Sequence, residues 1–352
     1  MPRDTRRAFL SALETVSPQI ARAFDEAIQD IRSTAQARVI EEAIERAIET
    51  GDIGRGVREV TAALNLGAEF FAPLDRAIED AFRAGAVYQL STLPKPSSHT
   101  APGLVVRFQG RHPRAEAWTR RRAAELITEI ISNTEEVIQA TIAEAVEQSR
   151  PYRKVAADLI GRLDGNRRKG GLIGLHSRQA AAVRAARADL ENLERRYFTR
   201  SRRDRRYDAM VRKAVREGKP LAKADIEKIT GRYADRLLRL RGETIARTEG
   251  NKAMNAGRHE GIQQLIDSGK VPVEAVTKIW DSTPGPRTRD SHRAMQGQEV
   301  RWQAKFQSPV TGAYLDHPHD PDAPASETAN CRCSERVRID WAMVARWQRQ
   351  AA

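Results

Sequence analysis

The chain has 352 residues, with 60 lysines and arginines against 47 aspartates and glutamates and a formal net charge of +13. This length suggests roughly two or three domains, and a hydrophobic fraction of 40% is enough to build cores. No apolar stretch approaches the roughly 18 to 20 residues that cross a bilayer, so we expect no membrane partner. The only cysteines, Cys331 and Cys333, do not form a disulfide framework, and a reducing compartment is expected.

The positive charge is concentrated in one part of the chain. Residues 1–100 carry a net charge of −3, residues 101–150 are balanced, and residues 251–352 carry +2. Residues 151–250 hold 27 basic and 13 acidic side chains, a net charge of +14. Seven arginines of this region fall close together: Arg195, Arg196, Arg200, Arg202, Arg203, Arg205 and Arg206.

This arginine cluster predicts contact with a polyanion, because guanidinium groups match phosphate oxygens and displace counterions from DNA. Tyr197, Phe198 and Tyr207 lie among or beside the arginines and offer rings for stacking on single-stranded bases. Two other interpretations stay open, a solvated helix face and a surface that docks on an acidic partner protein. Because no base-reading signature is present, we expect non-specific contact with the backbone of double-stranded DNA.

Helical periodicity dominates the first part of the chain. Apolar side chains three and four residues apart predict helices over 20–31 and 40–48, the second ending at Gly51, and another helix after Pro73. A segment rich in proline and serine, over 93–103, then predicts a linker.

The middle of the chain predicts a long helical hairpin. A strong helix is expected over 115–148. A second helix over 177–196, with Ser177 as its cap, leads through a basic turn to a third helix over 223–267 that is interrupted near Gly250.

After Gly269 the pattern changes to short strands and turns. β-branched and aromatic residues predict a strand over 276–280, and a short helix is expected over 288–295. The remaining expected elements are a hairpin turn over 308–312, an irregular proline-rich segment over 317–324, a strand over 331–339 and a closing helix over 341–347.

The predicted fold is mainly α, with a long helical hairpin in the middle and a small C-terminal α+β domain. The expected parts are an N-terminal helical region (1–92), a linker or extended segment (93–114), a basic helical domain (115–268), a small α+β domain (269–340) and a C-terminal tail helix (341–352).

A series of motifs crowds into residues 245–340. In chain order they are Ile245-Ala-Arg-Thr-Glu249, Asn255-Ala-Gly257, Trp280-Asp281, Arg287-Thr-Arg-Asp-Ser-His292 and Asn330-Cys-Arg-Cys333. This ordered set resembles the C-terminal domain of the phage Mu F-like minor head proteins, the phage head morphogenesis family. The signature helix begins near residue 240, and the resemblance covers about a third of the chain well. The segment Gly174-Leu-His-Ser-Arg-Gln179 is similar, more loosely, to the family's middle region.

The resemblance implies a minor capsid protein of a tailed phage or prophage, present in few copies in the head interior at the portal vertex and assembled in the host cytoplasm. It implies the portal protein and the major capsid or scaffold protein as partners. It also implies a role in head assembly and in DNA packaging or ejection. Two alternatives stay open: a nuclease-type enzyme that acts on DNA, and a transient DNA-binding assembly factor that is absent from the mature virion.

Four residues form the candidate metal set, because zinc prefers a tetrahedron of thiolate and imidazole ligands. They are His292, His317, Cys331 and Cys333. On a strand the two thiols would face the same side about 7 Å apart, too far for a disulfide but within reach of a shared zinc ion. The alternative is that the cysteines pack as small apolar residues and that no cofactor is bound.

A structural clasp is another interpretation of the motif residues. In it, Glu249 holds Arg287 or Arg289 in a buried bidentate pair, and Asp281 holds the other arginine. Asn330 satisfies backbone groups of the proline-rich loop. The predicted clasp residues are Arg247, Glu249, Asp281, Arg287, Arg289, His292 and Asn330.

Catalysis has less support in the sequence. His317 and His319, with Asp320 and Glu327, suggest a nuclease, and Cys331 with His292 suggests a thiol enzyme. No ordered catalytic motif accompanies either set, and the glycines over 161–174 form no phosphate-binding loop. We therefore predict no catalytic residue and a protein that is not an enzyme.

Overall fold

The computed structural model describes residues 2–93, 107–286, 288–328 and 331–351. These residues form two compact units, each of which combines segments that are distant in the sequence. Unit 1 consists of Met1–Ala21, Asp75–Ala123 and Thr244–Ala352, and unit 2 consists of Arg22–Leu74 and Ala124–Glu243. Arg287, Asn330 and most of the predicted linker over 93–114 lie outside the described residues.

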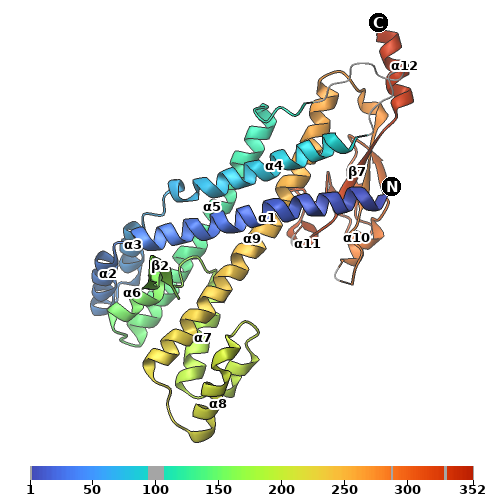
Figure 1. Ribbon diagram of the computed structural model, residues 1–352. Coiled ribbons are helices and arrows are strands. Elements are labelled where there is room, and N and C mark those ends of the chain that lie inside the picture. The colour runs from blue at the N-terminus through green and yellow to red at the C-terminus, as the bar shows by residue number, and fades with distance from the viewer. Residues whose placement is uncertain (1, 94–106, 287, 329–330, 352) are drawn as a thin grey trace. The chain divides into compact units, whose positions relative to one another are not determined.

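Helices make up most of the described residues, as the apolar periodicity predicts (Figure 1). The long helices are α1 (Pro2–Thr34), α4 (Ala72–Thr92), α5 (Pro113–Glu147) and α9 (Lys223–Asp267). The shorter ones are α2 (Ala37–Thr50), α3 (Ile53–Leu64), α6 (Tyr152–Ile160), α7 (Ser177–Glu191), α8 (Asp208–Glu217), α10 (Asp290–Ala294), α11 (Ala325–Thr328) and α12 (Trp341–Ala351). The 3-10 helices are η1 (Ala68–Phe71), η2 (Arg195–Thr199), η3 (Arg205–Tyr207) and η4 (Val273–Ala275).

The strands are short and antiparallel, and most lie near the C-terminus (Figure 1). A sheet with the order β4-β3-β7 joins β4 (Glu299–Arg301), β3 (Val276–Asp281) and β7 (Ser334–Ile339). The predicted hairpin turn over 308–312 connects β5 (Phe306–Gln307) to β6 (Tyr314–Leu315), and a further hairpin joins β1 (Arg162–Asp164) to β2 (Arg167–Lys169). The mainly α fold with a small C-terminal α+β part is confirmed.

The central strand β3 places alternate side chains in two cores of unit 1. Val276 packs with Ile262 and Leu265 of α9 and with Val344 of α12. Four residues further on, Trp280 packs in a separate cluster with Met295, Phe306, Cys331 and Cys333. Because side chains of a strand alternate between its two faces, Val276 and Trp280 lie on the same face. One end of this face packs in the first core and the other end packs in the second.

Helices α4 and α9 of unit 1 approach each other at glycines. A Cβ atom on Gly257 would lie 1.9 Å from the carbonyl oxygen of Phe82, and one on Gly85 would lie 2.1 Å from that of Met254. Real Cβ atoms do not come that close to backbone atoms, so any side chain at either position would push the helices apart. The Asn255-Ala-Gly257 motif therefore has a packing role.

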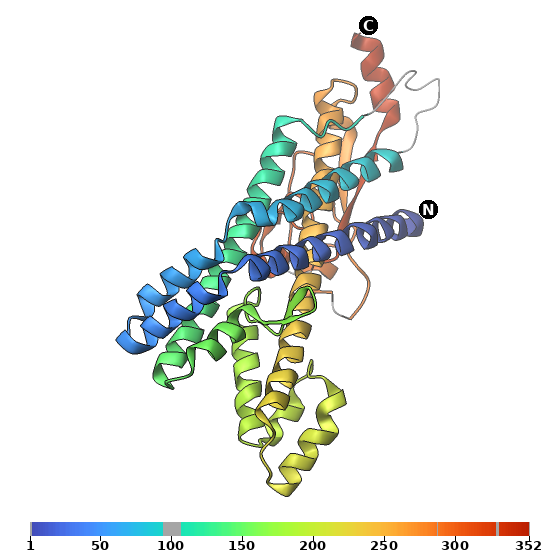
Figure 2. The same ribbon diagram turned by 60° about the vertical axis from the view of Figure 1, so that its left-hand side comes forward.

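In unit 2, α7 and the first part of α9 form the predicted antiparallel hairpin, with α8 beside it (Figure 2). Gln179, near the start of α7, donates a 3.1 Å hydrogen bond to the carbonyl oxygen of Leu237. Leu190, near the end of α7, packs against Ile226 and Ile229. The two helices therefore run in opposite directions, and the apolar contacts close the hairpin at its basic end.

Two buried arginines hold the glycine-rich loop over 170–176 that precedes α7. Arg32 of α1 is fully buried and donates to the carbonyl oxygens of Gly171 and Ile173. Arg241 of α9 donates a 2.9 Å hydrogen bond to the carbonyl oxygen of Gly174. Burial lowers the pKa of both guanidinium groups to about 10, so they stay charged at neutral pH. This anchoring explains why the loop over 170–176 needs no regular structure.

Two expectations about helix ends and interruptions are wrong. Helix α7 ends at Glu191 rather than Arg196, and its cap is His176, whose ring accepts a 3.3 Å bond from the backbone N–H of Gln179. Helix α9 continues through Gly250. A Cβ atom there would lie 3.2 Å from Ser17 Oγ of α1, so this glycine makes room for a neighbouring helix and does not break its own.

The strand expected over 331–339 begins only at Ser334, because the backbone N–H of Cys333 turns back to the Sγ of Cys331. Helices α3, α6 and α8 and the β1-β2 hairpin were not predicted from the sequence. Helix α8 follows the arginine cluster directly, where charge obscures the apolar period.

Replacing Gly257 with alanine tests the contact between α4 and α9. We expect the free energy of unfolding to fall by about 1–3 kcal/mol, because the new Cβ overlaps backbone atoms that cannot rotate away. The matched control is Gly231→Ala in the same helix, where the nearest atom lies 3.4 Å away and alanine favours the helix by up to about 1 kcal/mol. Equal stability of the two variants in denaturant unfolding would contradict this packing.

Candidate functional site

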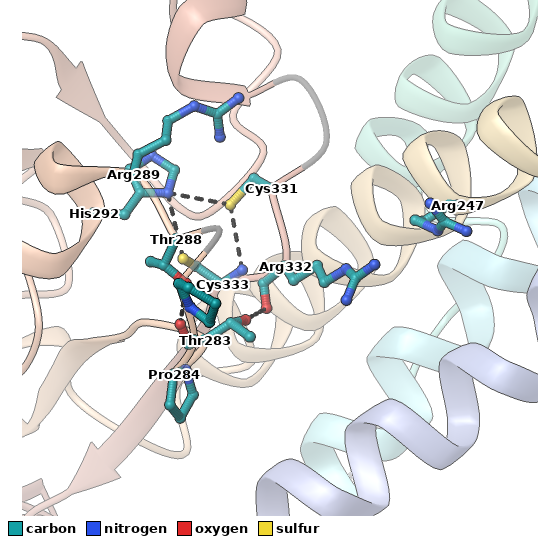
Figure 3. A pocket seen from close by; sticks show the side chains of 11 residues that line it. Arg247, Thr283, Pro284, Thr288, Arg289, His292, Cys331, Arg332 and Cys333 are labelled. Carbon is teal, nitrogen blue, oxygen red and sulfur yellow. Dashed lines mark hydrogen bonds between the residues drawn. The ribbon is translucent and has the colours of Figure 1, made fainter. Parts of the chain in front are cut away.

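Three motif side chains meet in unit 1 at the end of the sheet (Figure 3). Helix α10 presents His292, and the turn before β7 presents Cys331 and Cys333. His292 Nδ1 lies 3.4 Å from the Sγ of Cys333 and 3.5 Å from the Sγ of Cys331. All three ligand atoms lie within 4.8 Å of one another, and none of the three residues is more than 3% exposed. We call these three residues the Cys–His cluster.

Local structure fixes each member of the Cys–His cluster. The ring of Trp280 on β3 meets the His292 ring edge-on with centroids 5.3 Å apart, and Ser282 Oγ donates to the carbonyl oxygen of His292. Cys331 is held by a 3.3 Å bond from its backbone N–H to the carbonyl oxygen of Thr328. The buried Trp280 thus supports both the sheet and the cluster.

A buried carboxylate stands behind the histidine. Glu327 Oε2 lies 2.8 Å from His292 Nε2, on the ring side opposite the thiols. Glu327 also accepts hydrogen bonds from Ser291 Oγ at 3.0 Å and Thr311 Oγ1 at 2.6 Å, and it is 1% exposed. A carboxylate this close to Nε2 favours the ring tautomer that turns the lone pair of Nδ1 toward the two sulfurs.

The two thiols share a proton unequally. A hydrogen bond from the Cys331 thiol, helped by His292, lowers the pKa of Cys333 below the usual range of a thiol. The same hydrogen bond to Cys333, together with burial, raises the pKa of Cys331. The two shifts are opposed because charge repulsion and burial disfavour a second thiolate beside the first.

A cavity of about 510 Å³ borders the Cys–His cluster. Its wall includes the turn from Thr283 to Pro286, and three arginines also line it, Arg247 of α9, Arg289 and Arg332. Thr283 Oγ1 donates to the carbonyl oxygen of Arg332 and ties the turn to the cysteine segment. A wall with three guanidinium groups favours an anion or the negative end of a dipole inside the cavity.

The candidate metal set is only partly brought together. His317 does not join the Cys–His cluster: its Nδ1 lies 2.9 Å from the carbonyl oxygen of Pro318, and its ring packs on His259 with centroids 5.1 Å apart. His319 is 1% exposed and is not a member of the Cys–His cluster. Burial lowers the pKa of His319 to about 3, so its ring stays neutral.

One predicted clasp residue, Glu249, pairs with an arginine outside the predicted clasp. Glu249 is held by Arg122 of α5 through two short bonds, one of them 2.7 Å long, and this pair is almost fully buried. The clasp interpretation did not predict this partner, and Arg287, one of the two arginines that it did name, lies outside the described residues. Arg247 is exposed and lines the cavity, and Asp281 accepts a 3.5 Å bond from Gln296.

The carboxylates of the nuclease interpretation have local roles. Asp320 accepts hydrogen bonds from the backbone N–H groups of Asp316 and Asp322 at 2.7 and 2.9 Å. Such bonds fix the proline-rich loop without help from regular structure. Glu327 faces His292, as described above. Within the described ranges, the Cys–His cluster is the group of three or more acidic, histidine or cysteine side chains close enough to share a metal ion.

Two residues have contacts that the sequence did not predict: Glu327, which was expected in a nuclease site, and Arg122. Glu327 lies four residues before Cys331, and that spacing was the available signal for a carboxylate linked to the cysteines. Arg122 is the last of three consecutive arginines on α5, and nothing in their spacing marks it as the partner of a residue more than a hundred positions away.

Much of the arginine cluster in unit 2 is paired within the chain. Three buried aspartates each receive two arginines: Asp189 binds Arg196 and Arg200, Asp204 binds Arg206 and Arg236, and Asp208 binds Arg203 and Arg212. The side chains of Arg200 and Arg203 are only 13% and 11% exposed. These two arginines therefore stabilise the fold around η2 and η3.

The other arginines of the cluster face solvent. Arg195, Arg202 and Arg205 are exposed, and no carboxylate of the described residues lies within ion-pair distance of them. Tyr197, which sequence analysis offered for stacking on bases, is 1% exposed and packs with Leu190 and Val211. Burial raises the pKa of Tyr197 to about 12. The exposed surface is thus one of charge, without Tyr197.

Comparison with known proteins identifies the family of this chain. A family model described as "Phage Mu protein F like protein" matches residues 136–336, more than half of the chain. The matched range contains both the arginine cluster and the Cys–His cluster. No curated protein and no solved structure matches. Among the described residues, no helix combines the length and apolar character needed to cross a membrane.

Replacing Asp204 with asparagine tests the structural role of the paired arginines. Hydrogen bonds from Arg206 hold the pKa of Asp204 at about 2, below its ordinary value of 3.8. A depressed carboxyl pKa adds stability above the unfolded-state pKa, and that stability is lost as the pH falls from about 4 to about 2. We expect the variant to lose about 1–2 kcal/mol at pH 7 and to approach the parent in acid.

Denaturant unfolding over a pH series measures this difference. The matched control is Asp290→Asn, because Asp290 also pairs with an arginine but its side chain is 81% exposed. We expect no measurable change in the control. A deficit of the Asp204 variant that stays constant from pH 7 to pH 2 would show that the charge of Asp204 is not what stabilises this region.

Proposed function

Because this chain belongs to the phage Mu protein F-like family and is therefore a phage head morphogenesis protein, we propose that it is a minor virion component at the portal vertex whose exposed arginines contact double-stranded DNA. The role near the portal and in DNA packaging or ejection follows from the resemblance of its motifs to that family. The portal protein and the major capsid or scaffold protein are its expected partners.

The observation that carries the DNA contact is the set of exposed arginines without a carboxylate partner among the described residues: Arg195, Arg202 and Arg205. They lie in a segment, 195–228, with 13 basic and 5 acidic side chains. Two of those acids, Asp204 and Asp208, are buried and already paired. Each such pair removes one positive and one negative charge, so the segment keeps a net charge of +8, 13 minus 5, which is the sign that a polyanion requires.

Duplex DNA fits this surface better than a single strand does. Single-strand binding proteins stack bases on exposed aromatic rings, but Tyr197 is buried, and Phe198 packs against its apolar cluster with Arg212 over its ring at 5.2 Å. Tyr207 is also partly buried against this cluster, with Lys228 Nζ 6.0 Å from the centre of its ring. The surface therefore offers cationic side chains more than free aromatic rings. Such groups bind phosphates and read no sequence.

A salt series measures the proposed DNA contact. We expect the parent chain to bind duplex DNA of any sequence, with a log affinity that falls linearly with log salt concentration. Replacing Arg195, Arg202 and Arg205 together by alanine should make this slope shallower by up to about 2.7, since each lost phosphate contact contributes about 0.9. Arg200 and Arg203 are left in place because they hold buried aspartates.

The matched control removes three other exposed arginines from the same unit, Arg38, Arg55 and Arg58, with the same change in net charge. We expect the control to keep the parent's slope within about one unit. An equal loss in both variants would mean that only net charge matters. Absence of DNA binding at low salt, together with binding of the exposed arginines to purified portal protein, would favour an acidic protein partner.

Mass spectrometry of purified particles tests the position of the protein. We expect the chain in mature virions in fewer copies than the major capsid protein, and we expect its loss from particles assembled without the portal protein. If the chain is present in assembly intermediates but absent from mature virions, it is a transient assembly factor and not a virion component.

A further inference from the structure

The Cys–His cluster has a geometry that hydrogen bonding alone does not explain. One ring nitrogen, His292 Nδ1, faces two sulfur atoms at 3.4 and 3.5 Å, although a neutral imidazole nitrogen accepts one hydrogen bond well. Three donor atoms that converge on one point, each within 4.8 Å of the others, form a pattern typical of a metal site.

The distances agree with tetrahedral zinc. With zinc–sulfur bonds of about 2.3 Å and zinc–nitrogen bonds of about 2.0 Å, tetrahedral angles place a ligand sulfur about 3.5 Å from a ligand nitrogen. The sulfurs of Cys331 and Cys333 lie at 3.5 and 3.4 Å from His292 Nδ1. The side chains thus hold the spacing that a bound ion would impose, and little rearrangement is needed to admit one.

The surroundings of His292 also fit a metal ligand. A histidine that binds zinc through one nitrogen commonly donates its other N–H to a carboxylate, which fixes the ring and raises its basicity. Glu327 Oε2 occupies this position at 2.8 Å from Nε2, and Ser291 and Thr311 hold the carboxylate in place. These contacts support Nδ1 as the ligand atom.

We propose that His292, Cys331 and Cys333 bind one zinc ion, with Glu327 as the carboxylate that orients His292 and with the fourth coordination position facing the arginine-lined cavity. Within the described ranges no fourth histidine, cysteine or acidic side chain joins the group, and all three ligands border that cavity. A water molecule from the cavity completes the tetrahedron. This inference does not depend on the proposed DNA contact, which lies in the other unit.

The bound zinc ion would act as a cross-link. It would join α10 to the turn before β7 and so close the chain over 293–330, which includes β4, β5, β6 and the proline-rich segment. Cys331 and Cys333 also pack against Trp280 and Phe306, so the ion would lie at the edge of an apolar cluster of unit 1. Binding energy at such a site adds directly to folding stability.

The rival interpretation is a thiol nucleophile. Cys333, His292 and Glu327 stand in the order of nucleophile, base and orienting carboxylate. The zinc site is favoured because a second thiol, Cys331, sits at the same distance from the same nitrogen, where a nucleophile needs none.

Metal analysis of the full chain, purified without chelator and without a histidine tag, tests the proposal. We expect about one equivalent of zinc in the parent and less than about 0.2 in His292→Ala, Cys331→Ser and Cys333→Ser. His317→Ala should keep its zinc, because His317 lies outside the Cys–His cluster. Cobalt exchanged for zinc should give the intense visible bands of a tetrahedral ion and a thiolate-to-cobalt charge-transfer band.

Two further measurements keep the proposal testable if the ligand variants fail to fold. Glu327→Gln retains the side-chain shape and should weaken zinc affinity about 10- to 100-fold in a competition titration with a chelator. Removing zinc from the parent with the chelator should lower the melting temperature by at least about 5 °C, and added zinc should restore it.

The outcomes that overturn the proposal are distinct. A folded parent without zinc or cobalt binding, whose Cys333 is alkylated rapidly at neutral pH, would support the thiol nucleophile. A folded parent without metal binding and with inert thiols would show that the cysteines only pack. Loss of zinc in a folded His319→Ala variant would place that buried ring in the fourth position and overturn the open site.

Discussion

One constraint governs this structure. A charged side chain that is buried away from water needs hydrogen-bond or ion-pair partners within the protein. The chain is 30% charged, and several of its guanidinium groups are buried. Arg32 and Arg241 are compensated by loop carbonyl oxygens, and Arg258 by Gln89 and by the carbonyl oxygen of Glu335. A buried charge without such partners costs several kcal/mol, so these bonds decide where loops and helices can lie.

The same constraint separates the arginine cluster into two kinds of residue. Arginines that meet Asp189, Asp204 or Asp208 are part of the fold, because each of these aspartates is buried and would be destabilising without them. Arg195, Arg202 and Arg205 do not pair with any of these three aspartates. Part of the positive charge of this segment is thus needed to compensate buried aspartates. Only the exposed arginines that pair with none of these aspartates are available to a partner. Net charge alone does not make this distinction.

Much of the fold was predictable because it depends on local patterns. Spacings of three and four residues predicted the helices, and the β-branched run before Trp280 predicted the central strand.

The predictions that failed concern residues whose roles depend on neighbours far away in the sequence. Gly250 looked like a break, but it makes room for α1, and Glu249 looked like the partner of a loop arginine, but Arg122 of α5 holds it. The sequence placed His292, Cys331 and Cys333 in one candidate set, yet it did not separate them from His317, because packing on His259 has no signature in the sequence.

Compensation of charge also links the Cys–His cluster to the rest of the molecule. Two thiolates side by side in an apolar environment repel each other, and the sulfurs of Cys331 and Cys333 lie close together in residues that are at most 3% exposed. A divalent ion removes the conflict, because it compensates both thiolates at once and leaves His292 neutral. Arg247, Arg289 and Arg332 line the cavity beside this site, so an overall neutral centre there avoids adding further positive charge. Two thiolates balance the double positive charge of zinc, and a neutral histidine adds none. Three neutral histidines would leave that positive charge uncompensated.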